Sequence, residues 1–440
     1  MTRRPHGTKH VSTGVRGTEK SVLPNGVCVL TEHVTDARSF ALGIWVNAGT
    51  RDEELSKAGI AHMIEHLVFR RSASRTSRQI ASAFEARGAY VNAFTSKEQT
   101  CYYVRALTPH FEACLKVLAD IVLHPVFDAR DVEKERRVIL EELKSYDDEP
   151  EELIQDVAEQ RLFGSHPMGS PITGHPHTVA AIRIPDLRRF HRAWYRMDNI
   201  TVAVAGGMAH QDIVRMVQSV FPQRASASGA SLARRPKRSL PKPRHPLSHA
   251  LERPFQQTHL CYARRTEGVR HKDRWALTLL NTVLGDGMSS RLHQRIREKL
   301  GGAYSVNSSL QLLTDCGVMS VYAGVERTSA ERIDQAVRKE LDVLASAGVA
   351  KSELKRAKEQ VKSGMMMSLE SLSARMNALA KAELEEGMFE DVNDTLEAID
   401  AVSLHDVARV ATGLGRASSW TRVCISGTED ASRSNDDDHE

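Results

Sequence analysis

Hydrophobic and polar residues alternate with a period of two in the first half of the chain, which is typical of half-buried strands. The strands expected from this pattern are 26–34, 39–49, 89–96 and 99–107, with a buried apolar strand at 199–206. A helical period separates and follows them, and it predicts helices at 57–69, 76–87, 109–123, 128–147 and 150–163. Strands and helices therefore alternate without one class dominating, which favours an α+β fold.

The second half of the chain has a similar pattern of expected strands and helices. Its expected strands are 256–266, 303–313, 317–325 and 418–427, and its expected helices are 273–285, 289–300 and several within 328–388. Residues 84–96 and 296–310 also run in parallel, each passing from a helix end through glycine into a strand. We therefore predict two homologous domains, each a mostly antiparallel sheet packed with helices.

A length of 440 residues also favours two domains over a single core. Between the halves, 222–246 contains Pro, Ser and seven Arg or Lys residues but no acid, which is typical of a linker. A nucleic-acid-binding arm is the alternative, but no aromatic residues are interleaved for base stacking. The predicted segments are a basic N-terminal arm at 1–21, a first domain at 22–221, a linker at 222–250, a second domain at 251–428 and an acidic tail at 429–440.

Composition narrows the classes of function. Hydrophobic residues make up 41% and charged residues 26%, with a formal charge of +4, so neither a nucleic-acid partner nor disorder is expected. No apolar run reaches the roughly 18 residues of a membrane span. The six cysteines form no CxxC pair, which favours a reducing compartment. We expect a cytoplasmic protein; the basic N-terminus is either a frayed arm or a transit peptide for an organelle matrix.

The stretch HMIEH at 62–66 carries the strongest chemical signal. On a helix, His62, Glu65 and His66 share one face, and the opposite stripe is apolar. No Lys, Arg or Asp occurs from 60 to 69, whereas a solvated face usually carries some, so the polar groups are expected to be enclosed. Two histidines one turn apart can bind one Zn²⁺, although such a pair also arises in ordinary helices.

A catalytic zinc site needs a third protein ligand and an open position. The predicted helix at 128–147 offers Glu135 and Glu142, which lie seven residues apart on its apolar stripe. Glu141 falls on the charged side instead. We therefore expect Glu142 to be the ligand and Glu135 to support it from behind, the alternative being that both are solvated.

These motifs together resemble the pitrilysin/insulinase family of zinc metallopeptidases. HxxEH is the inverse of the HExxH order and marks the inverzincins. ERRVILEE at 135–142, VNAFTSKEQTCYY at 91–103 and GMSSRLHQRIREKLGGAYSV at 287–306 are similar to further family segments. The likeness covers about 22–427 and is greatest to short members akin to the β subunit of mitochondrial processing peptidase and its bacterial relatives. It implies that each chain forms half of a clamshell.

The resemblance implies roles for individual residues. His62, His66 and Glu142 would bind one zinc ion per chain, and Glu65 would be the general base. Asn92 and Ala93 would contact the substrate backbone, and Arg297 and Tyr304 would reach the active site from the second domain. Asn92 in a turn, Arg297 on a helix surface and Tyr304 in a half-buried strand are the structural alternatives. The run FRRS at 69–72 and Asp286 depart from the family pattern and put substrate preference in doubt.

The resemblance thus implies a zinc-dependent endopeptidase acting on oligopeptides or on unfolded, presequence-like segments. It also implies a homodimer in which Arg297 and Tyr304 act on the partner's zinc, with no nucleic-acid or membrane partner. A non-catalytic subunit of the same fold, kept for assembly or peptide binding, is the alternative. A purely structural metal site is a third interpretation, and it predicts that the chain unfolds when zinc is removed.

Overall fold

The computed structural model describes the whole chain except residues 1–7, 12, 16, 222–237, 243 and 428–440. It divides into two compact units. The first comprises Met1–Leu143, Ser170–Ser239 and Met366–Asp391, and the second comprises Lys144–Gly169, Leu240–Met365 and Val392–Glu440. The units therefore differ from the contiguous domains predicted at 22–221 and 251–428, because each unit includes a segment from the other half of the chain.

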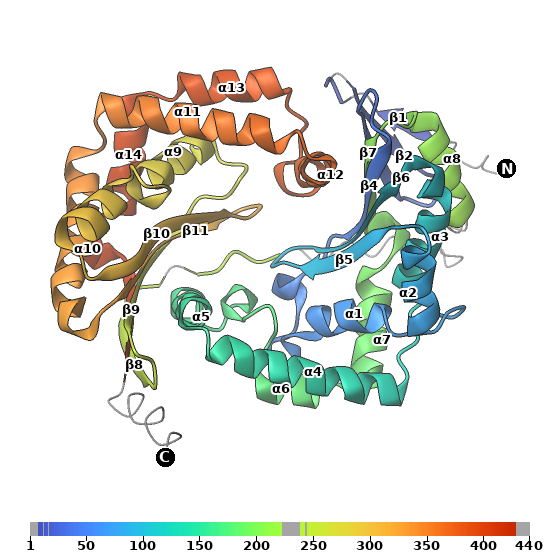
Figure 1. Ribbon diagram of the computed structural model, residues 1–440, viewed down its shortest axis with the longest axis horizontal. Coiled ribbons are helices and arrows are strands. Elements are labelled where there is room, and N and C mark those ends of the chain that lie inside the picture. The colour runs from blue at the N-terminus through green and yellow to red at the C-terminus, as the bar shows by residue number, and fades with distance from the viewer. Residues whose placement is uncertain (1–7, 12, 16, 222–237, 243, 428–440) are drawn as a thin grey trace, which may run out of the picture. The chain divides into compact units, whose positions relative to one another are not determined.

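The sheet of the first unit has the strand order β1-β2-β3-β7-β4-β6-β5 (Figure 1). Its strands are β1 (Lys9–Val11), β2 (Thr18–Val22), β3 (Cys28–His33), β4 (Ser39–Val46), β5 (Tyr90–Thr95), β6 (Thr100–Leu107) and β7 (Ile200–Gly206). Only β3 and β7 pair in parallel, and every other neighbouring pair is antiparallel. The strand β5 ends the sheet among the described residues.

The sheet of the second unit has the order β10-β11-β9-β12-β8. Its strands are β8 (Ser248–Arg253), β9 (Thr258–Thr266), β10 (Ala303–Leu312), β11 (Gly317–Val325) and β12 (Thr421–Gly427). Here β8 and β12 pair in parallel, and the other pairs are antiparallel. The order matches β5-β6-β4-β7-β3 strand for strand, in chain order and in direction. The prediction of two homologous α+β domains is confirmed.

Helices cover one face of each sheet around a large apolar core. In the first unit these helices include α1 (Ile60–Val68), α2 (Ser77–Glu85), α3 (Phe111–Leu123), α4 (Ala129–Asp147), α6 (Pro176–Ala181), α7 (Ile184–Trp194) and α8 (His210–Val220). In the second they include α9 (Arg274–Gly285), α10 (Ala330–Ala347), α11 (Lys351–Ser368), α13 (Val392–Ala401) and α14 (Leu404–Leu414). The bounds of α1, α2, α3, α4 and α9 lie within about three residues of those expected from hydrophobic periodicity, whereas α6, α7, α13 and α14 were not among the expected helices.

One helix on the opposite face of each sheet comes from the other half of the chain. In the first unit, α12 (Leu372–Lys381) packs Met376, Leu379 and Ala380 against β3, β4 and β7. In the second unit, α5 (Pro150–Phe163) packs Ile154 and Ala158 against β9 and β12. The exchange is reciprocal, and it explains why contiguous domain boundaries do not describe the units.

Three predicted segments need comment. Strand β1 lies within the predicted arm at 1–21 and β2 begins in it, although their mostly polar sequence gave no strand signal. The strand β8 begins at Ser248, inside the predicted linker, and its parallel pairing with β12 accounts for this extended conformation. Most of the remaining linker and the whole acidic tail lie outside the described residues.

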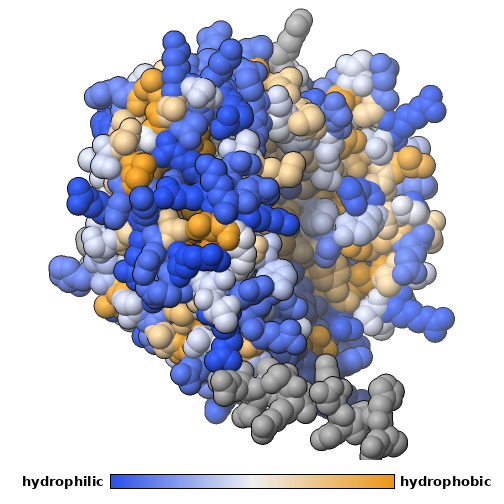
Figure 2. All heavy atoms as spheres, turned by 60° about the vertical axis from the view of Figure 1, so that its left-hand side comes forward, coloured by the Kyte–Doolittle hydropathy of each residue, from blue (hydrophilic) through white to orange (hydrophobic). Residues whose placement is uncertain are grey.

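The described residues include no helix that is both long enough and apolar enough to cross a bilayer. Hydrophilic side chains predominate on the face drawn in Figure 2, and apolar ones are scattered among them. Scattered apolar side chains are normal for a globular surface.

Candidate metal centre

The helix α1 contains the HMIEH stretch, and most of its residues are buried. Gly59 precedes it with a φ of 92°, and a Cβ there would lie 2.6 Å from the Thr173 carbonyl oxygen, so only glycine fits. The buried carboxylate of Glu53 accepts hydrogen bonds from the backbone N–H groups of Gly59 and Ala61, each at 2.8 Å. These bonds satisfy orphan donors at the start of the helix and fix the first turn, which carries His62.

The helix α4 supplies the acidic partners. Val132, Ile139 and Leu143 are buried along one stripe, and Glu135 lies on it with 1% exposure. Glu142, two turns further, is partly exposed beside α1, and Glu141 is exposed. The helical spacing therefore places Glu142 beside α1, two turns from Glu135.

The two histidines and Glu142 converge. Their ligand atoms all lie within 4.8 Å of one another, and the imidazole rings of His62 and His66 stand edge to face with centroids 4.6 Å apart. Nε2 of His62 lies 3.8 Å from Oε1 of Glu142, and Nε2 of His66 lies 3.7 Å from Oε2. These distances are too long for hydrogen bonds. They are close to the separation of about 3.4 Å expected for two atoms bound tetrahedrally to one zinc ion.

The surroundings of the imidazoles suit metal ligands. Burial and the nearby charge of His66 lower the pKa of His62 to about 3, so its ring is neutral. Nδ1 of His66 lies 3.3 Å from Oε2 of Glu135, the contact expected of a carboxylate that orients a ligand. Nδ1 of His62 is buried and has no hydrogen-bond partner among the described residues. The donor set therefore fits a zinc ion, and of the two histidines His66 has a carboxylate, that of Glu135, to orient its ring.

Two supporting contacts were missed by the sequence reasoning. Arg70, which departs from the family pattern, forms an ion pair with Glu135 at 2.5 Å. Burial works against the charge of Glu135, but His66 and Arg70 outweigh it and hold its pKa below the usual value. The other is the hydroxyl of Thr95 at the end of β5, which donates to Oε2 of Glu65 at 2.5 Å. Its only signal in the sequence was its place three residues after Asn92.

Glu65 lies beside the cluster and outside the set of converging ligand atoms. Burial raises its pKa, and the Thr95 hydrogen bond and the charge of His66 partly offset that rise. A carboxylate with a raised pKa next to a metal site is suited to exchanging protons near neutral pH.

The other predicted residues occupy separate places. Asn92 and Ala93 lie on the edge strand β5, where the Asn92 side chain is exposed and its Oδ1 accepts the Ala93 N–H at 2.9 Å. Arg297 lies in a π-helical segment (His293–Leu300) and Tyr304 in β10, both exposed and both in the second unit. The structure thus gathers His62, Glu65, His66, Glu135 and Glu142 within the first unit.

The described residues contain a second group of potential ligands, formed by His10, Glu19 and His210. Both ring nitrogens of His210 are already hydrogen-bonded at 2.8 Å, to the hydroxyls of Ser21 and Thr31. A cation would have to displace one of these hydroxyls. The group therefore fits a metal less well than the cluster on α1 and α4.

Comparison with known proteins agrees with this geometry. Residues 28–175 match the family model described as Insulinase (Peptidase family M16), and residues 181–361 match the one described as Peptidase M16 inactive domain. An uncharacterized zinc protease of Mycobacterium leprae is 38% identical over 90% of this chain and 88% of its own length. The uncharacterized zinc protease YmxG of Bacillus subtilis is 34% identical over 89% of this chain and 94% of its own.

Solved structures share the fold. A protease from Helicobacter pylori gives a TM-score of 0.85 at 21% identity, over 93% of this chain and 99% of that one. A protein from Pseudomonas fluorescens, described as a peptidase M16 inactive domain, gives 0.84 at 21% identity, over 96% and 98%. Taken with the sequence relatives, these matches establish that the chain belongs to the insulinase family, peptidase family M16.

Proposed function

We propose that this protein is a zinc-dependent endopeptidase that cleaves oligopeptides or unfolded segments. One observation carries the proposal: the ligand atoms of His62, His66 and Glu142 converge within 4.8 Å, with the enclosed carboxylate of Glu65 beside them. The zinc proteases among its relatives support the same chemistry. Homology alone would not suffice, because a related protein is described as an inactive domain.

Each side chain has a defined task in this proposal. His62, His66 and Glu142 hold the zinc ion, which when bound supplies Lewis acidity and lowers the pKa of water to about 7. Glu65 takes the proton of the attacking water and returns it to the leaving amine, so one carboxylate serves both half-reactions. Thr95 holds Glu65 in place. Glu135, fixed by Arg70, keeps the His66 ring oriented.

The substrate would bind in an extended conformation along β5. This strand ends the described sheet, and an edge strand can pair with an incoming peptide through main-chain hydrogen bonds. The side chain of Asn92 covers the Ala93 N–H, so it has to turn away before a peptide can use that donor. Main-chain recognition predicts broad specificity.

The test is cleavage of a quenched fluorescent peptide by the full chain loaded with zinc. We expect activity that chelator removes and zinc restores. Glu65→Gln should retain zinc by elemental analysis while its turnover falls about 100- to 10,000-fold. Glu85→Gln, which changes an exposed glutamate of the same unit, is the matched control. If zinc-loaded wild type is inactive on a broad peptide library, the chain is a non-catalytic subunit. Unfolding by chelator would indicate a structural metal.

We further propose that the chain forms a homodimer in which Arg297 and Tyr304 serve the zinc site of the partner. Both side chains are exposed on the second unit and free to meet a substrate. Mixing inactive Glu65→Gln chains with Tyr304→Phe chains should restore activity, whereas each variant alone should not recover. The absence of any recovery in a proven mixed dimer would reject action in trans.

A further inference from the structure

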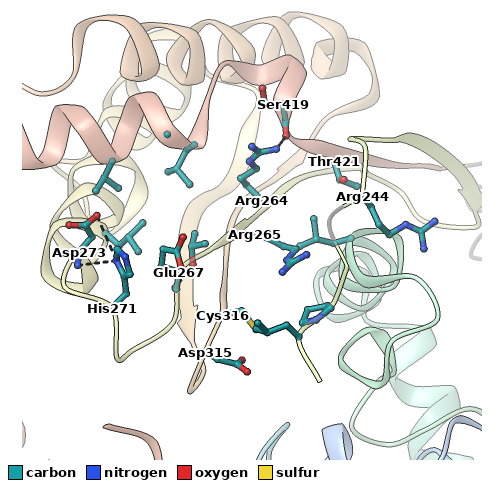
Figure 3. A pocket seen from close by; sticks show the side chains of 18 of the residues that line it. Arg244, Arg264, Arg265, Glu267, His271, Asp273, Asp315, Cys316, Ser419 and Thr421 are labelled. Atoms are coloured by element: carbon teal, nitrogen blue, oxygen red, sulfur yellow. Dashed lines mark hydrogen bonds and ion pairs between the residues drawn. The ribbon is translucent and has the colours of Figure 1, made fainter. Parts of the chain in front are cut away.

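A cavity lies entirely within the second unit and takes no part in the proposed peptidase chemistry. Its volume is about 780 Å³, which is within the range of small-molecule sites. Apolar side chains from three helices line it, namely Leu162, Leu277, Val410 and Leu414. Arg264 and Arg265 line it from the end of β9 (Figure 3).

The sheet explains why there is space at this point. The strand β12 begins at Thr421, opposite Ala263 of β9. The last residues of β9, Arg264 to Thr266, therefore have no partner in β12 and pair only with β11. The cavity lies beside this part of β9, which has a neighbouring strand on one side only. Hydrogen bonds to β11 hold the backbone that carries the two arginines.

Neither arginine has a carboxylate partner among the described residues. Arg264 donates to the Ser419 carbonyl oxygen at 2.5 Å, and Arg265 donates to the Lys242 carbonyl oxygen at 3.0 Å. Nε of Arg265 is buried without a hydrogen-bond partner. A guanidinium has five N–H donors, so most of the N–H groups of these two side chains have no acceptor among the described residues. Burial and the charge of Arg265 lower the pKa of Arg264.

Two other partly buried arginines of this unit differ. Arg291 is paired with Glu353, and Arg422 with Asp334. Within the cavity itself, Arg409 forms two hydrogen bonds to Asp273, at 2.6 and 2.7 Å, so that carboxylate is already engaged. The remaining acids of the lining are Glu267, which is exposed, and Asp315, and neither forms an ion pair with the arginines of β9.

We propose that this cavity binds a small organic oxyanion, with its carboxylate or phosphate group on Arg264 and Arg265 and its apolar body against Leu277, Val410 and Leu414. Arginine suits this task because its planar fork matches both kinds of oxyanion. A ligand would supply the negative charge that the two guanidinium groups lack. The site is separate from the metal cluster, which belongs to the first unit.

Calorimetric titration of the full chain tests the proposal without any need for peptidase activity. The probes are phenyl phosphate, N-acetyl-leucine and its uncharged analogue N-acetyl-leucinamide, each up to about 10 mM. We expect at least one anion to bind and the amide to bind at least about tenfold more weakly. The tighter anion identifies the class of ligand. Failure of both anions to bind, or equal binding of the amide, would overturn the proposal.

Two kinds of variant locate the site. The double change Arg264→Gln and Arg265→Gln should weaken anion binding about tenfold or more, whereas Arg327→Gln, which removes an exposed charge from the same unit, should not. Gly413→Phe is independent of charge: Gly413 lines the cavity, and a Cβ there meets no atom within 4 Å. It should block the ligand with both arginines in place.

The matched control for the steric variant is Gly364→Phe. Gly364 also lies in a helix of the second unit with open space around its Cβ, but it does not line the cavity. Should the arginine variant fail to fold, the two phenylalanine variants decide the question alone. Equal anion binding by both of them and the wild type would contradict the assignment.

Discussion

The helices α1 and α9 occupy equivalent places in the two units but differ in chemistry. Each follows the equivalent strand of its sheet, β4 or β9, and precedes the hairpin at one edge of that sheet, β5–β6 or β10–β11. The helix α1 combines a buried apolar stripe with His62, Glu65 and His66. The helix α9 has the sequence RWALTLLNTVLG, which contains no histidine, cysteine or acid, and its buried face is mainly apolar.

This difference separates what the fold requires from what the function requires. Both helices pack into a continuous core, so apolar residues alone are enough to seat a helix here. The imidazoles and carboxylates of α1 are then an addition that burial makes costly unless they have partners. The family model that matches 181–361 is described as an inactive domain, in agreement with the composition of α9.

The largest effect should come from removing a proposed zinc ligand of the first unit, which contains α1. Glu142→Gln leaves the two histidines without their carboxylate, so we expect zinc to fall from one per chain to a small fraction. Peptidase activity should drop by about 1,000-fold or more. Glu141→Gln alters the exposed neighbour on the same helix and should leave both unchanged. Elemental analysis and peptide cleavage measure the outcome, and full zinc occupancy in the Glu142→Gln variant would remove Glu142 from the ligand set.

The equivalent test on α9 should affect stability alone. Leu280 is fully buried in the second core, so Leu280→Ala should lower the free energy of unfolding of that unit by about 2–5 kcal/mol. Hydrogen exchange followed by mass spectrometry can assign the loss to residues of the second unit. Zinc content per folded chain should stay at the wild-type value. A folded variant that lost its zinc would show that the two helices are not functionally separate.

The sequence could predict those parts of the fold that depend on local pattern. Periodicity placed α4 and α5 almost to the residue, because each is a long amphipathic segment with a clear start. It could not show that α5 and α12 cover each other's sheets, since an apolar stripe does not specify which sheet it meets. Nor did it reveal β8, whose residues are mostly exposed and depend on β12 for their pairing.

At the metal site, too, the sequence predicts what depends on local spacing and misses contacts between distant segments. Helical spacing alone brought His62 and His66 to one face and selected Glu142 over Glu141. The contacts of Thr95 with Glu65 and of Arg70 with Glu135 join elements that are far apart in the chain, so no local period reports them. The sequence reasoning also missed Arg264 and Arg265 in the cavity of the second unit, because their lack of carboxylate partners is visible only once the chain is folded.

A pH titration should affect the second unit through His259. Its ring is buried beside the Tyr322 hydroxyl, at 2.9 Å, and burial lowers its pKa to about 4. Between pH 6.5 and 4 the unfolded chain takes up a proton that the folded unit does not, so stability is complete above pH 6.5 and falls as the pH decreases. We expect a loss of about 3 kcal/mol across this window.

His259→Gln should flatten that pH dependence, with hydrogen exchange of the second unit as the measurement. His245→Gln, which alters an exposed histidine of the same unit, is the control and should retain the wild-type slope. An unchanged slope in the His259 variant would assign the acid sensitivity of this unit to other groups.

The smallest effect concerns Glu53, whose side chain supports the first turn of α1. The carboxylate of Glu53 accepts two N–H groups at the start of the helix, which favours its charge, whereas complete burial opposes the charge and raises the pKa to about 8. With a pKa of about 8 the carboxyl group of Glu53 is mostly neutral near pH 7, so Glu53→Gln changes little charge but leaves one helix N–H without its acceptor. We therefore expect a net loss of only about 1 kcal/mol in the first unit.

Zinc affinity should fall slightly in this variant, by about two- to fivefold, because His62 lies on the turn that Glu53 holds. The exposed neighbour provides the control Glu54→Gln, and competition with a zinc chelator gives the readout. At the start of α9 the N–H of Asp273 donates to Nδ1 of His271 at 3.3 Å, whereas at the start of α1 a buried carboxylate accepts two N–H groups. Unchanged zinc affinity in the Glu53 variant would mean that the support serves stability and not the metal centre.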